Sequence, residues 1–98
     1  MSPNTVRIVG ALAAVEPLRH TPAGLPVVEF TLTHASEQIE SGQKRQVEFE
    51  MAAKATGELA ARIAGIRQGS GMKVEGFLNR KHRMSRQIVL HVTNMVLI

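Results

Sequence analysis

The stretch MKVEGFLNRKHRMSRQIVLHVTNMVLI, which spans Met72–Ile98, decides the fold. Within it, two apolar runs (72–79 and 87–98) flank the basic segment Arg80–Arg86, which from here on is called the basic loop. Alternating apolar residues in the first run are typical of a β-strand. The second run is apolar on both faces, which indicates a strand that is buried on both sides or used in assembly.

Three more strands and one helix are predicted upstream. Period-2 alternation predicts the strands over 5–14, 27–34 and 45–53, and helical spacing predicts a short helix over 56–66 with Thr56 as a candidate cap. The polar, glycine- or proline-containing segments 17–26 and 35–44 are expected to be hairpin loops. The order β-β-β-α-β-β is that of the OB-fold. We therefore expect an all-β domain with one short helix, a five-stranded Greek-key barrel over residues 1–98.

Composition excludes several classes of function. The chain has 98 residues, enough for one core, and no cysteine, so disulfides, thiolate metal sites and cysteine nucleophiles are excluded. The 4 histidines have no metal-ligand spacing, and no nucleophile–base pair or glycine-rich phosphate cradle is recognisable. The sequence shows neither a signal-peptide pattern nor an apolar run of ~20 residues. We expect a cytoplasmic protein that is not an enzyme and has no metal or cofactor.

The formal net charge of +4 is concentrated in the last third of the chain. Residues 67–98 contain six Lys or Arg and one Glu, a net of +5, whereas residues 1–66 contain six cations and seven Glu, a net of −1. Such clustering favours a polyanionic partner. In an OB-fold the basic loop would be L45, which binds oligonucleotides together with L12 and the surface of strands 2 and 3.

Four segments carry a resemblance to a known family. They are PLRHTPAGLPVVEFTLTH (17–34), SEQIESGQKRQVEFEM (36–51), VEGFLNRKHR (74–83) and IVLHVTNMVLI (88–98). In this order they resemble the primosomal replication protein N (PriB) family, bacterial relatives of the single-stranded DNA-binding proteins. The resemblance covers nearly the whole chain. It implies a homodimer of OB-folds that binds single-stranded DNA without sequence preference, joins the primosomal helicase PriA and acts in replication restart, without catalysis or metal.

The resemblance assigns DNA contacts to Lys81, Arg83, Arg86 and Arg45, and the charge pattern and strand alternation add their neighbours. The expected contact residues are Arg80, Lys81, His82, Arg83, Arg86, Lys44, Arg45 and Phe77. The resemblance also implies a dimer through the first strand, and the expected interface residues are Val6, Ile8, Val9 and Ala11. Glu48 and Gln43 stand where better-known members of the family carry aromatic residues, so neither position can stack a base.

Few aromatic side chains are available for stacking. There is no Trp or Tyr; Phe30 and Phe49 are expected in the core, and Phe77 is as consistent with an outward as with an inward position. DNA binding is therefore expected to depend on electrostatics. Glu48 and Glu50, on the outward face of the third strand, would repel phosphates.

Those two glutamates leave several alternatives open. The DNA path avoids the third strand, or the glutamates pair with Lys44 or Arg45, or they serve a protein partner, or they form a solvated strand face. Two other functions remain alternatives to single-stranded DNA binding. One is a protein-interaction OB module of the primosome with weak DNA binding, and the other is an RNA-binding OB domain.

Overall fold

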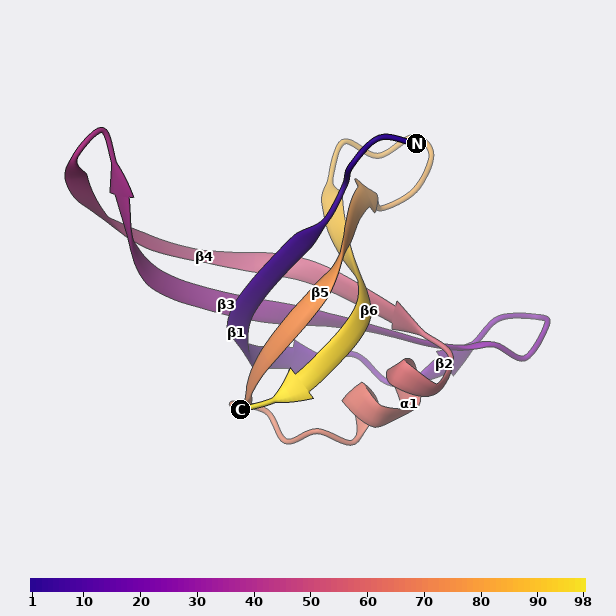
Figure 1. Ribbon diagram of the computed structural model, residues 1–98. Helices are drawn as coiled ribbons and strands as arrows, with labels where there is room; N and C mark the ends of the chain where they lie inside the picture. Colours follow the sequence, from indigo (N-terminus) through magenta and orange to yellow (C-terminus); the bar gives the residue numbers. More distant parts are fainter.

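The computed structural model describes residues 1–98 and consists of a closed barrel, one helix and a long two-stranded projection (Figure 1). The elements are β1 (Val6–Val15), β2 (Arg19–His20), β3 (Pro26–Glu40), β4 (Gln43–Thr56), α1 (Glu58–Ala64), β5 (Gly71–Arg80) and β6 (Ile88–Leu97). The sheet order is β1-β5-β6-β4-β3-β2, and an additional pairing of β1 with β3 closes the barrel. β4 and β6 pair in parallel. This confirms the predicted OB-fold, with β2 as a two-residue addition inside the first hairpin.

Close approach of neighbouring strands explains the two glycines inside β1 and β5. A Cβ at Gly76 would lie 1.9 Å from the carbonyl oxygen of His91, and a Cβ at Gly10 would lie 2.6 Å from that of Thr33. Backbone atoms cannot move aside as a flexible side chain can. Only glycine therefore lets the strands curl tightly enough to close the barrel.

A β-bulge changes the inward face of β6. Pairing with β5 passes from Glu75 opposite Asn94 to Gly76 opposite Val92, which leaves Thr93 as the extra residue. Val92 and Met95 are consequently both buried although they are three residues apart. The bulge therefore moves the buried side of the strand from one alternating set of residues to the other, whereas the apolar side chains of Val96 and Leu97 remain exposed.

The core fills the barrel, and α1 covers one end of it. Leu12, Val28, Leu32, Met72, Val74 and Leu90 belong to a single buried cluster. Phe30 is 4% exposed, as predicted for a core residue. Ala60 and Ile63 bring the helix into the same cluster. No helix is long and apolar enough to cross a membrane.

β3 and β4 continue beyond the barrel as a projection, which we call the arm (His34–Glu50). Figure 1 shows it extending away from the other strands. The predicted loop over 35–44 is wrong, because these residues form an antiparallel ladder that reaches Glu40 opposite Gln43. The turn is only Ser41–Gly42, with φ of 51° and 77°, as in a type I′ hairpin. Residues 35–44 are polar on both faces of the ladder, so their sequence lacks the apolar alternation by which a strand is recognised.

The helix begins later than predicted. Thr56 is the last residue of β4 and pairs with Val27, so it does not cap the helix. The N-cap is Gly57, whose φ of 72° favours glycine, and no side chain caps this end. The short helix is held by its contacts with β3 and β4 rather than by a capping residue.

Candidate nucleic-acid interface

The basic loop connects β5 to β6 and lies at the same end of the molecule as the N-terminus (Figure 1). Its backbone is folded on itself: Lys81 N donates to Gln87 O (2.9 Å), and Ser85 N donates to His82 O (2.9 Å). The Arg80 guanidinium donates to the carbonyl oxygen of Arg83 (2.8 Å). These bonds give the loop a defined shape.

All the predicted contact residues of the basic loop are exposed and free of acidic partners. The exposed side chains are Arg80, Lys81, His82, Arg83 and Arg86. The chain forms four ion pairs, and none includes a residue of the basic loop. The loop therefore presents an uncompensated positive charge to solvent.

A groove of about 380 Å³ lies beside the basic loop, across β3 and β4. Lys81 and Gln87 line it from the loop, Glu16 from the end of β1, and Thr31 and Ala52 from the strands. This is the surface between L12 and L45 that binds oligonucleotides in OB-folds. The strand residues of the groove were not among the predicted contacts, because small side chains carry no charge or aromatic signal.

Acidic residues also border the groove. Glu29 lines it, but this carboxylate is 3.4 Å from the guanidinium of Arg19. Glu16 forms no ion pair. The positive charge is therefore concentrated on the loop side of the groove.

The two predicted contacts on β4 lie apart from the basic loop. Lys44 and Arg45 are near the tip of the arm (Figure 1). Lys44 Nζ is 3.9 Å from a carboxylate oxygen of Glu37, and Arg45 Nε donates to Glu40 (3.1 Å). Neither cation pairs with Glu48 or Glu50, so the alternative in which these glutamates pair with Lys44 or Arg45 is wrong.

Phe49 is not a core residue. It is 39% exposed, and its ring centroid is 5.1 Å from that of His34 on the paired strand. The pairing of β3 with β1 ends at Thr33. The next pair of β3 and β4, His34 opposite Phe49, therefore lies beyond the barrel and has no core to face. The prediction was wrong because alternation shows which side chains share a face but not where the barrel ends.

Phe49 instead lines an open concavity of about 590 Å³ between β1 and the arm. Val9 and Ala11 line it from β1, and Glu48 and Glu50 line it from β4. His34 Nδ1 lies 2.6 Å from the carbonyl oxygen of Val9, which joins the arm to β1. The concavity is thus an apolar surface with acidic residues beside it.

The four residues expected at a dimer interface divide between the two faces of β1. Val6 and Ile8 pack against the core, whereas Val9 is 47% exposed and Ala11 is half-buried. From Val6 to Gly10 the strand pairs with β5 only, so its other edge has no strand partner. The outward surface available to a second copy therefore comes from Val9 and Ala11.

Phe77 faces outward and is 39% exposed. Its ring is stacked on that of His91, with centroids 4.9 Å apart and an interplanar angle of 8°. Partial burial, together with the positive charge of Lys54, lowers the pKa of His91 below 6.5. Both effects favour the neutral imidazole, which acts as an aromatic neighbour of Phe77.

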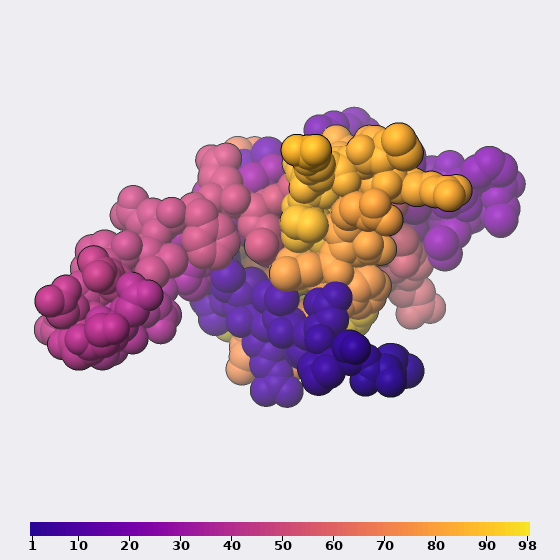
Figure 2. Space-filling view, turned by 90° about the horizontal axis from the view of Figure 1, so that it is seen from above, coloured from indigo at the N-terminus to yellow at the C-terminus, as the bar shows by residue number.

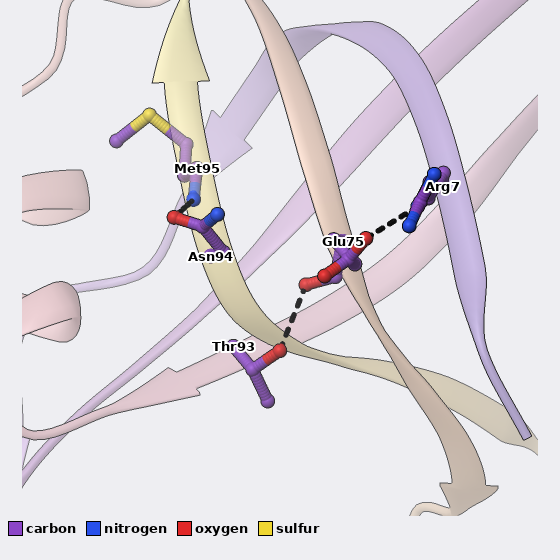
Figure 3. A network of polar contacts seen from close by, with 5 residues as sticks. All are labelled: Arg7, Glu75, Thr93, Asn94 and Met95. Atoms are coloured by element: carbon purple, nitrogen blue, oxygen red, sulfur yellow. Dashed lines mark hydrogen bonds and ion pairs between the residues drawn. The ribbon is translucent and has the colours of Figure 1, made fainter.

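Polar contacts join β1, β5 and β6 on their outer face, which also carries the exposed apolar side chains of Val9 and Val96. Arg7 forms an ion pair with Glu75, and the hydroxyl of Thr93 donates to the carbonyl oxygen of Glu75 (Figure 3). Asn94 accepts a hydrogen bond from the backbone N–H of Met95 (3.0 Å). No group of three or more His, Asp or Glu side chains is arranged to hold a metal ion.

Comparison with known proteins gives a consistent result. The family described as "Another single-strand binding protein family" matches residues 4–94. The replication restart protein PriB of Nitrosomonas europaea is 45% identical, over 91% of this chain and 82% of the relative. That of Bordetella pertussis is 39% identical, over 91% and 83%. A solved structure of PriB from Ralstonia solanacearum superposes with a TM-score of 0.91 at 32% identity and covers 98% of both chains. The chain therefore belongs to the PriB replication restart proteins and to this family of single-strand binding proteins.

Proposed function

We propose that this protein binds single-stranded DNA without sequence preference, as a non-enzymatic accessory protein of replication restart in the cytoplasm. The observation that carries the proposal is the uncompensated charge of the basic loop beside the groove across β3 and β4. Family membership supports it, because the relatives are named replication restart proteins and the family model is described as single-strand binding.

Electrostatics would supply most of the affinity. Lys81, Arg83 and Arg86 are exposed and unpaired, so each can neutralise a phosphate and release a counterion. Phosphate contacts carry no base information, which accounts for the absence of sequence preference. The small side chains of Thr31 and Ala52 leave the groove open to bases without offering a distinctive set of donors and acceptors.

The test is fluorescence anisotropy with a labelled oligo(dT) and a DNA duplex of the same length. We expect tighter binding to the single strand. Neutralisation of about four phosphates gives a slope of log K against log salt near −3 for single strands. A slope flatter than about −1, or preference for the duplex, contradicts the proposal. An RNA oligonucleotide that binds more tightly than its DNA counterpart would support the RNA-binding alternative.

The proposal includes a homodimer that forms through β1. Two observations support it: the unpaired edge of β1 from Val6 to Gly10, and the exposed apolar side chain of Val9 beside the concavity that Phe49 lines. An open strand edge is a template for pairing with another strand. A second copy related by a two-fold axis would supply the same strand and bury the same apolar surface.

The acidic arm favours a second function, in which the protein contacts the primosomal helicase PriA. The arm carries four glutamates against two cations, a net charge of −2. Lys44 and Arg45 are already paired, which leaves Glu48 and Glu50 free beside an apolar concavity. Such a surface suits a basic and apolar protein partner better than a phosphate backbone. Helicase binding that persists beside negligible oligonucleotide binding at low salt would make protein interaction the principal function.

A further inference from the structure

The Phe77 ring stacks on His91 with one face only, and the residue is 39% exposed. β5 lies between β1 and β6 in the sheet, and Phe77 pairs with His91 on β6. The centroid separation of 4.9 Å matches the spacing of neighbouring strands, about 4.8 Å, so the two rings stack along the direction from strand to strand. One face of Phe77 thus meets His91, and the other is directed toward the β1 side.

On that side lies the N-terminal segment, Met1–Thr5. The pairing of β1 with β5 ends at Val6 opposite Gly76, and Thr5 precedes this pair in the chain. The side chain of Asn4 then holds the segment against β5: its Nδ2 donates to Leu78 O (2.8 Å), and its Oδ1 accepts from Leu78 N (3.0 Å). Figure 2 shows this segment (indigo) in contact with the orange surface that includes β5.

The N-terminal segment and Phe77 line an open cavity of about 520 Å³. The volume is within the range of small-ligand sites, roughly 300–1,000 Å³. Its lining side chains are those of Met1, Ser2, Pro3, Asn4, Thr5 and Phe77. No Lys, Arg, Asp or Glu side chain is among them, and the one charged group of the lining is the α-ammonium of Met1. The surface beside the Phe77 ring therefore suits a flat, uncharged ring.

We propose that one unpaired nucleobase of the bound strand stacks on the free face of Phe77, in the slot between β5 and the N-terminal segment. The inference rests on the proposed DNA-binding function and assigns a base site to it. The base would extend the column formed by the His91 and Phe77 rings. Stacking on an aromatic ring is tolerant of sequence, as the proposed function requires.

The basic loop lies where it can deliver such a base. Arg80 follows Phe77 by three residues on β5, which is about 10 Å along a strand. A DNA backbone held by the cations of the loop would therefore continue toward the slot. The side chain of Asn4 is engaged with Leu78, so it offers little to distinguish one base from another.

The first test uses a single introduced fluorophore, because the chain has no Trp or Tyr. Phe77→Trp gives a reporter in the slot, and Val96→Trp, at a position that is 55% exposed near the far end of β6, gives a matched control. We expect oligo(dT) to quench Phe77→Trp and to leave Val96→Trp nearly unchanged. Oligonucleotide binding seen by anisotropy without quenching of Phe77→Trp would overturn the slot but not the proposed function. No binding by anisotropy would overturn both.

The second test separates stacking from a structural effect. Phe77→Ala and Phe77→Leu are compared with Val96→Ala on oligo(dT) and on an abasic oligonucleotide of the same length. We expect the Phe77 variants to lose ~5- to 150-fold in affinity for oligo(dT), with no loss on the abasic strand. Equal losses on both strands would overturn the proposal, because the effect would then be structural. Tighter oligo(dT) binding after deletion of residues 1–4 would also overturn it, since the segment would then cover Phe77 rather than form a wall of the slot.

Discussion

Removal of two charges from the basic loop should change the salt dependence of DNA binding in proportion to the phosphates released. Lys81→Ala with Arg83→Ala removes two exposed cations that have no acidic partner. Each phosphate contact contributes about 0.7 to the slope for single strands, so the slope should become shallower by about 1.4. Over the tenfold range from about 1 M to about 0.1 M salt, the affinity of the variant would therefore rise roughly 25-fold less than the affinity of the parent.

The arm provides a control with the same change in net charge. Lys44→Ala with Arg45→Ala also removes two cations, but these are paired with Glu37 and Glu40 and lie far from the loop. We expect this variant to change the slope by less than about 0.3. Anisotropy titrations of both variants and the parent, over about 50 to 200 mM salt, measure the difference. If both double variants change the slope equally, net charge alone controls binding. If the loop variant keeps the parental slope, the site is wrongly assigned.

Three further predictions concern the fold and the assembly. Gly76→Ala should lower the free energy of unfolding in urea by about 3 kcal/mol or more, because the new Cβ would overlap the backbone of β6. The control Gly65→Ala should change it by less than about 1 kcal/mol, and equal effects of the two substitutions would contradict the close approach of β5 and β6. The free energy of unfolding should fall as the pH drops below 6.5, because the lowered pKa of His91 in the folded state makes the unfolded chain bind the proton more readily. A His91→Gln variant that loses as much stability as the parent between about pH 7 and 5 would contradict this. Val9→Glu should convert a dimer to a monomer in sedimentation velocity, and a dimer of unchanged strength would refute the β1 interface.

The barrel was predictable because its strands face a core. Alternation along the chain identified the five long strands, and helical spacing identified the helix. The excess of cations pointed to the loop between the last two strands. The arm was not predictable in this way, since His34–Glu50 leaves the barrel and has no core to impose a period. Phe49 was misplaced for the same reason.

The sequence could not show which charges are already compensated. Lys44 and Arg45 look equivalent to the cations of the basic loop until their pairing with Glu37 and Glu40 is seen. The slot beside Phe77 also depends on a contact between distant residues, because Asn4 and Leu78 are 74 positions apart. Such contacts follow from the closure of the barrel rather than from any local pattern.

The DNA-binding surface is mapped most directly by the changes in backbone amide NMR shifts on addition of oligo(dT). We expect the largest shifts in the basic loop, at Phe77 and along the groove at Thr31 and Ala52. We expect small shifts at the tip of the arm and near Val96. Shifts confined to the arm, with the basic loop unchanged, would contradict the claim that this loop holds the DNA.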